Sequence, residues 1–156
     1  LDGPAVSELS ELQVAALSAA ACGGFTAAVM ANFKPFSIAG INASCVSSIH
    51  AVAFSGLDAN QTSFLQPYAF TALTRYQLAK IPAEAASSFT FNQMSSLSQI
   101  DVCAGFTGAQ IANVPVPSFD GFSATCISQM GGSVFNNMSA SQVQEITPTA
   151  FAGIQP

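Results

Sequence analysis

Large apolar residues recur at every eighth position along almost the whole chain. We call the blocks that end at these residues octads. They run from Asp2 to Ile154, and only one of the nineteen, 98–106, has nine residues. A second apolar residue lies three positions before each block end, with Thr62 as its one polar exception. Self-similarity at a fixed short period is typical of repeat proteins, so the sequence predicts one unit used nineteen times.

The polar positions of the octad predict a short capped helix. Ser, Thr, Asp or Asn usually stands first, where its oxygen can accept a hydrogen bond from an amide of the first turn. The prolines fall at positions one to three, which suits a helix start. Gly at position seven is expected to let the backbone leave the helix. Gln at position four would complete a capping box, and it is found at Gln13, Gln61, Gln77, Gln93, Gln110 and Gln142.

Two kinds of octad alternate. One reads T-x-x-Q-φ-x-x-φ (φ, apolar), as in 74–81 (TRYQLAKI), and the other reads x-P-x-A-F-x-G-φ, as in 147–154 (TPTAFAGI). Helices this short need neighbours to be stable. We therefore expect an all-α solenoid of very short capped helices, with the 8-residue unit paired into a 16-residue repeat. A stacked aromatic ladder is expected from the second kind, at Phe54, Phe70, Phe119, Phe135 and Phe151.

A longer period is superimposed on the octads. Laying 22–73 over 103–154 without gaps gives 18 identities in 52 positions, at an offset of 81 residues. We therefore interpret 1–156 as one continuous segment with an internal duplication of about 81 residues, 22–102 and 103–156, the second copy being incomplete. Leu1 and Gln155-Pro156 resemble parts of further octads, so we expect a chain cut from a longer array, or copies that stack end to end.

The four cysteines form two pairs with equal spacing. Cys22 and Cys45 are 23 residues apart, as are Cys103 and Cys126. Residues about three octads apart can be neighbours across one turn of a solenoid, so we predict disulfides Cys22–Cys45 and Cys103–Cys126. The alternative is four buried thiols. A zinc site is not expected, because there is no C-x-x-C motif and only one His.

Composition limits the partners. Only 7% of the residues are charged and the net charge is -5, so no basic patch favours nucleic acid or an anionic membrane surface. The uncharged stretch 14–33 is long enough to cross a bilayer. Polar residues interrupt it at the octad spacing, however, and we expect no membrane span. No signal peptide is visible, so a secreted protein would have its signal upstream.

Three sequons make N-glycosylation a candidate modification. All three avoid the apolar positions five and eight, so a glycan could point outward. Together with paired cysteines, they favour an extracellular or cell-surface protein. The candidate residues are Asn42, Asn60 and Asn137.

Catalysis finds little support in the sequence. His50, the only histidine, falls at a cap position, and only Glu8 and Glu11 are carboxylates close together. We interpret these two as lying near a helix end and the next helix start, where Glu11 is favoured by the helix dipole. No enzyme, cofactor or metal is expected. The extra residue of the irregular octad, near Ile100–Asp101, is either a kink or, by preference, a tolerated loop insertion.

The T-x-x-Q octads 90–97, 107–114 and 139–146 resemble short-helix repeats of very long extracellular surface proteins, including adhesin-like chains. The sequence AFSGL at 53–57 resembles part of an extracellular leucine-rich repeat, which implies a leucine-rich-repeat-like solenoid as an alternative fold.

These resemblances lead to two expected functions. The first is an extracellular structural glycoprotein that forms a fibre, sheath, stalk or matrix element by end-to-end or lateral self-association. The alternative is an adhesin or receptor solenoid that binds a protein or glycan on one face. The sequence offers one candidate cluster for such a face, at Phe64, Arg75, Tyr76, Lys80 and Glu84.

Overall fold

The computed structural model describes residues 3–153, which form nineteen short helices, one in each octad. In chain order they are α1 (Gly3–Val6), α2 (Glu11–Ala15), α3 (Ala19–Gly23), α4 (Ala27–Ala31), α5 (Pro35–Ile38), α6 (Ala43–Ser48), η1 (Ala51–Gly56), α7 (Ala59–Phe64), α8 (Pro67–Phe70), α9 (Arg75–Leu78), η2 (Ala85–Ser88), α10 (Phe91–Ser95), η3 (Val102–Gly105), α11 (Gly108–Asn113), η4 (Val116–Gly121), α12 (Ala124–Gln129), α13 (Gly132–Phe135), α14 (Ala140–Glu145) and α15 (Pro148–Phe151). The all-α class is confirmed. Residues 3–153 contain no strand, so the leucine-rich-repeat alternative, which needs one in each repeat, is not supported.

The predicted caps start these helices. All six glutamines form complete capping boxes with the residue three positions earlier. In α10, for example, the Thr90 amide donates to Gln93 Oε1 at 2.9 Å and the Gln93 amide donates to Thr90 Oγ1 at 3.3 Å. Five more helices have a side-chain cap without the glutamine, from Ser18, Thr26, Asn42, Ser123 and Thr147. The capping prediction is confirmed.

Among residues 3–153, 3-10 helices occur in only one of the two kinds of octad. All four 3-10 helices, η1 to η4, lie in octads of the second kind. Their starts carry no side-chain cap; His50 before η1 and Pro115 before η4 are examples. The glutamine boxes instead precede α-helices. Every side-chain cap found in residues 3–153 therefore starts an α-helix, although the α-helices α5, α8 and α13 have none.

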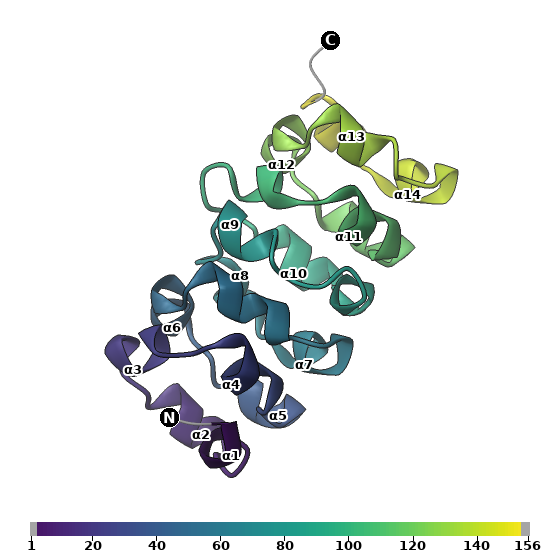
Figure 1. Ribbon diagram of the computed structural model, residues 1–156. Helices are drawn as coiled ribbons and strands as arrows, with labels where there is room; N and C mark the ends of the chain where they lie inside the picture. Colours follow the sequence, from purple (N-terminus) through teal and green to yellow (C-terminus); the bar gives the residue numbers. More distant parts are fainter. Residues whose placement is uncertain (1–2, 154–156) are drawn as a thin grey trace.

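Helices three octads apart pack against each other. This spacing arranges them in three columns, which are α1–α4–η1–α9–η3–α12–α15, α2–α5–α7–η2–α11–α13 and α3–α6–α8–α10–η4–α14. Figure 1 shows the resulting stack, with the two chain ends at its opposite ends. Because three is odd, every such contact joins one octad of each kind. Within a column, each octad therefore packs only against octads of the other kind.

Glycine at position seven makes these contacts close. A Cβ added at Gly56 would overlap the carbonyl oxygen of Ala27, in the helix three octads earlier. The same holds for four more glycines of this kind, Gly40 on Glu11, Gly105 on Arg75, Gly121 on Phe91 and Gly153 on Ala124. Among residues 3–153 no glycine has a positive φ. The expectation that glycine lets the chain leave the helix is therefore wrong, because its role is close approach of two backbones.

The core is formed by the residues at positions five and eight. Even Thr62, the polar exception, is fully buried, and its hydroxyl donates to the Asp58 carbonyl at 2.7 Å. The predicted stack of position-five phenylalanines is wrong. Neighbouring helices in a column belong to octads of opposite kinds, so the position-five residues of two second-kind octads are never column neighbours. In addition, Phe151 is 38% exposed. An edge-to-face chain forms instead, with ring centroids 5.3–6.4 Å apart and mainly from position eight, at Phe70, Phe89, Phe106, Phe122 and Phe119.

The extra residue of the irregular octad lies in an exposed turn before η3. Asp101 has φ 64°, the only positive φ of a non-glycine residue between 3 and 153, and Ile100 is 89% exposed. Asp tolerates this left-handed conformation better than most residues. Because η3 still packs against α9 and α12, the turn is a tolerated insertion.

Candidate functional site

Five buried glutamines connect helices that are far apart in the sequence. Gln93 is 1% exposed, and its Nε2 donates to the carbonyls of Thr62 at 2.9 Å and Leu65 at 2.7 Å. The other four each donate to the equivalent pair of carbonyls, at positions five and eight of the octad four units earlier, over 2.6–2.9 Å. We call this set the glutamine ladder: Gln61, Gln77, Gln93, Gln110 and Gln142.

The acceptors of the ladder are carbonyls at helix ends. The last carbonyls of a helix have no partner within it; Leu65, for example, caps the C-terminus of α7. Each ladder glutamine therefore satisfies an amide at the start of its own helix and carbonyls at the end of another. Sequence reasoning found the first role and missed the second. The available clue was that position four is never Glu, which could accept from the cap amide but could not donate.

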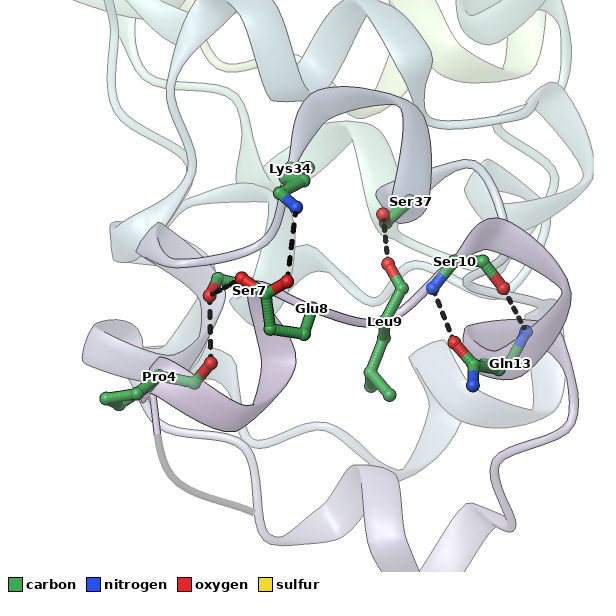
Figure 2. Close-up of polar contacts among 8 residues, drawn as sticks. All are labelled: Pro4, Ser7, Glu8, Leu9, Ser10, Gln13, Lys34 and Ser37. Atoms are coloured by element: carbon green, nitrogen blue, oxygen red, sulfur yellow. Dashed lines mark hydrogen bonds and ion pairs between the residues drawn. The ribbon is translucent and has the colours of Figure 1, made fainter.

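In two octads a serine at position four, in place of glutamine, donates to the position-eight carbonyl four octads earlier. Ser118 Oγ donates to the Phe89 carbonyl at 2.7 Å, and Ser37 Oγ donates to the Leu9 carbonyl at 2.5 Å. Figure 2 shows Ser37 reaching Leu9 beside the capping box of Ser10 and Gln13. Gln13 is exposed, and its side-chain nitrogen donates no hydrogen bond within residues 3–153. The octad 10–17 thus carries the capping box without the ladder bond.

Both predicted disulfides are confirmed. Cys22–Cys45 joins α3 to α6 with a Cα–Cα distance of 5.3 Å, and Cys103–Cys126 joins η3 to α12 with 5.1 Å. All four cysteines are at most 2% exposed. Cys45 and Cys126 occupy position four, the position of the ladder glutamines. A covalent link between stacked helices therefore stands there in place of a polar one.

Replacing both Cys22 and Cys45 by Ala is expected to lower the free energy of unfolding by about 3 kcal/mol, because the 23-residue loop is no longer closed in the unfolded chain. Urea unfolding under oxidising conditions measures this. Ser44→Ala, an exposed change in the same helix, is the control and should have little effect. An unchanged unfolding midpoint in the double variant would show that this disulfide does not hold α3 to α6.

Three further side chains bridge octads at the surface. The Tyr68 hydroxyl donates to the Ala39 carbonyl at 2.9 Å, and burial, followed by the charge of Glu11, raises the pKa of Tyr68. Gln99 and Asn42 make similar bonds, to the carbonyls of Thr71 at 2.7 Å and Ala15 at 3.3 Å. Polar bonds between octads therefore continue outside the core.

Charged side chains are spread thinly over the surface. Glu8 pairs with Lys34 at 3.7 Å (Figure 2), and Glu11 lies in the first turn of α2 as expected. His50 is an exposed cap residue of η1 whose side chain makes no capping bond.

Of the cluster considered for ligand recognition, the structure joins Arg75 and Tyr76. The Arg75 guanidinium donates to the Tyr76 hydroxyl at 2.7 Å and lies 4.7 Å from the ring centroid of that tyrosine. The same hydrogen bond raises the pKa of Arg75. No described contact connects this pair to Phe64, Lys80 or Glu84.

The three sequons differ in their surroundings. Asn60 is an exposed residue of α7, Asn42 is the half-buried cap of α6, and Asn137 follows α13 at the surface. The part of the chain that the structure describes has no pocket and no group of three or more His, Cys, Asp or Glu that could hold a metal ion. None of its helices is long and apolar enough to cross a membrane. No protein-family model, curated protein or solved structure matches the chain.

Proposed function

We propose that the chain is an extracellular solenoid and a structural repeat glycoprotein, which builds a fibre, sheath, stalk or matrix element from copies of itself. The glutamine ladder is the observation that carries this proposal. It joins one octad to the octad four units earlier through the same atoms each time, as Gln93 does with Thr62 and Leu65. Interactions that repeat along one direction suit a protein that extends along that direction.

Ladder groups without a ladder partner among residues 3–153 support the proposed self-association. Gln13 has an exposed amide that donates no ladder bond within these residues. The carbonyls of Val143 and Ile146 are equivalent to ladder acceptors but accept no side-chain bond within residues 3–153. A second copy would bring such a donor and such acceptors together. The interface would then reuse the chemistry that holds the octads within one chain.

The disulfides support an oxidising compartment. Disulfides form and persist in secreted and cell-surface proteins and are rare in the cytosol. Both bonds here are buried and each joins two stacked helices. An extracellular location follows as part of the proposal.

Electron microscopy of the purified full chain at rising concentration tests the proposed assembly. We expect filaments for the natural chain and fewer or shorter ones for Gln13→Glu, because Glu can still complete the capping box but cannot donate the ladder bond. Glu11→Gln, which changes the charge on the same short helix by one unit in the opposite direction, is the control and should assemble normally. Monodisperse particles of the natural chain at all concentrations would overturn self-association.

One observation favours ligand recognition as a second function. Val52, Tyr76 and Ile100 occupy position three in consecutive octads of one column and are 62%, 64% and 89% exposed. An exposed apolar row beside Arg75 suits the apolar face of a glycan or protein ligand. Tyr76→Ser would then reduce binding to a glycan array or to cells without affecting filaments, whereas unchanged binding would exclude this row.

A further inference from the structure

We infer that the folded protein carries an N-linked glycan at Asn60, and that this glycan is attached before the chain folds. The inference rests on the extracellular location proposed above. It selects one of the three candidate glycosylation sites. The selection follows from the contacts that each asparagine, and the Ser or Thr two residues after it, make in the folded chain.

Modification of the Asn60 side-chain nitrogen breaks no hydrogen bond within residues 3–153. Asn60 is the second residue of α7, it is exposed, and its side chain makes no hydrogen bond in the structure. Its backbone carbonyl accepts from the Ser63 hydroxyl at 2.6 Å. A sugar on Asn60 Nδ2 therefore replaces contacts with solvent.

Asn137 is unsuited to a glycan in the folded state. Its Nδ2 donates to the Ser133 carbonyl at 2.8 Å. The same nitrogen lies against Gly108 of α11, so closely that even a Cβ added there would overlap it. A sugar attached to this nitrogen before folding would keep the side chain from packing against Gly108, so chains modified there are expected to fold poorly.

Asn42 holds two elements together. Its Oδ1 accepts from the Cys45 amide at 2.9 Å, which caps α6, and its Nδ2 donates to the Ala15 carbonyl of α2 at 3.3 Å. The side chain is half-buried. A sugar on Asn42 Nδ2 would therefore be directed at the end of α2, so chains modified there are expected to fold poorly.

The rest of the Asn60 sequon is hidden after folding. Gln61 is 2% exposed and belongs to the glutamine ladder, while Thr62 is fully buried with its hydroxyl bonded to Asp58. A transferase that reads both the asparagine and the hydroxyl two residues later cannot reach this Thr. The modification must therefore precede the folding of α7.

The reaction is a group transfer from a lipid-linked diphospho-oligosaccharide. The Asn60 side-chain nitrogen forms a bond to the anomeric carbon of the first sugar and loses one proton. The bond from that carbon to the diphosphate oxygen breaks, and the lipid diphosphate leaves with the electron pair. No oxidation or reduction takes place, and the amide keeps one N–H.

Expression of the full chain in secreting eukaryotic cells, followed by enzymatic deglycosylation in heavy-oxygen water and peptide mass spectrometry, tests the site. We expect the isotope label at residue 60 in most secreted molecules and little at 42 or 137. Thr62→Val is the matched variant. It removes the sequon, leaves Asn60 in place and puts Val at an apolar position, so it should be secreted without the label at 60. A secreted, disulfide-bonded chain without a glycan at Asn60 would overturn the inference alone, whereas a chain retained in the cell with reduced cysteines would overturn the proposed location.

Incubation of unglycosylated chain with purified oligosaccharyltransferase and a lipid-linked donor tests the timing. The reduced and unfolded chain should be modified at Asn60, and the folded, disulfide-bonded chain should be modified at least tenfold more slowly. Equal rates for the two forms would contradict attachment before folding.

Discussion

Replacing Gln93 by Met is expected to lower the free energy of unfolding by about 4 kcal/mol, since each buried polar group left without a partner costs about 1–3 kcal/mol. Met has a similar shape to Gln but can neither accept from the Thr90 amide nor donate to the carbonyls of Thr62 and Leu65. The site is 1% exposed, so water cannot replace these bonds. Urea unfolding of the natural chain and the variant, with disulfides intact, measures the difference.

Gln13→Met is the matched control for this prediction. Gln13 makes the same capping box with Ser10, but it is exposed and makes no ladder bond. Only the cap is weakened there, which is expected to cost about 1 kcal/mol or less. Similar losses for the two variants would mean that the ladder bonds contribute nothing and that capping alone explains the glutamines.

Gly56→Ala is expected to lower the free energy of unfolding by about 2–3 kcal/mol, in the range observed for overpacked cores. The added Cβ would overlap the Ala27 carbonyl oxygen, which belongs to a backbone and cannot rotate away. Helices α4 and η1, which pack directly against each other in their column, would have to move apart. Thermal and urea unfolding of the variant measure the loss.

Gly132→Ala provides a control with the opposite sign. Gly132 is the first residue of α13, and a Cβ added there meets no atom within 4 Å. Ala in a helix is favoured over Gly by about 0.5–1 kcal/mol, so this variant should be slightly more stable. If Gly56→Ala were equally harmless, close backbone approach would not be the reason for glycine at position seven.

The elements of this fold were predictable because their causes are local. The capping box of Thr90 and Gln93 lies within four residues, so the letters alone place the start of α10. The cysteine spacing also indicated which octads are neighbours, because a disulfide reports a distance in space as well as in sequence. Caps and disulfides together therefore gave the helices and their approximate stacking.

The contacts between octads were harder to predict, because they depend on which surfaces meet. The role of Gly56 required knowing that position seven of one kind lies on position two of the other. The prediction of stacked phenylalanines failed for the same reason, since Phe70 at position five contacts Phe89 at position eight and not another position-five ring. The octad pattern predicts which residues form each face of a helix, but not which face of another helix packs against it.

The choice among the three sequons also depends on contacts that the sequence pattern does not show. The pattern showed that Asn42 and Asn137 avoid the apolar positions. It could not show that their amide nitrogens are used by Ala15 and Ser133. Selecting Asn60 therefore required side-chain contacts that only the folded chain defines.

The glutamine ladder binds the octads into one continuous stack through its side-chain amides. Nuclear magnetic resonance of these amides tests this role directly. We expect slow exchange with water for the Nε2 protons of the ladder glutamines, which are Gln61, Gln77, Gln93, Gln110 and Gln142, and fast exchange for those of Gln13. We also expect Overhauser contacts from the Gln93 amide to Thr62 and Leu65, about 30 residues earlier in the chain. Fast exchange at all six glutamines, with contacts only to their own capping residues, would contradict it.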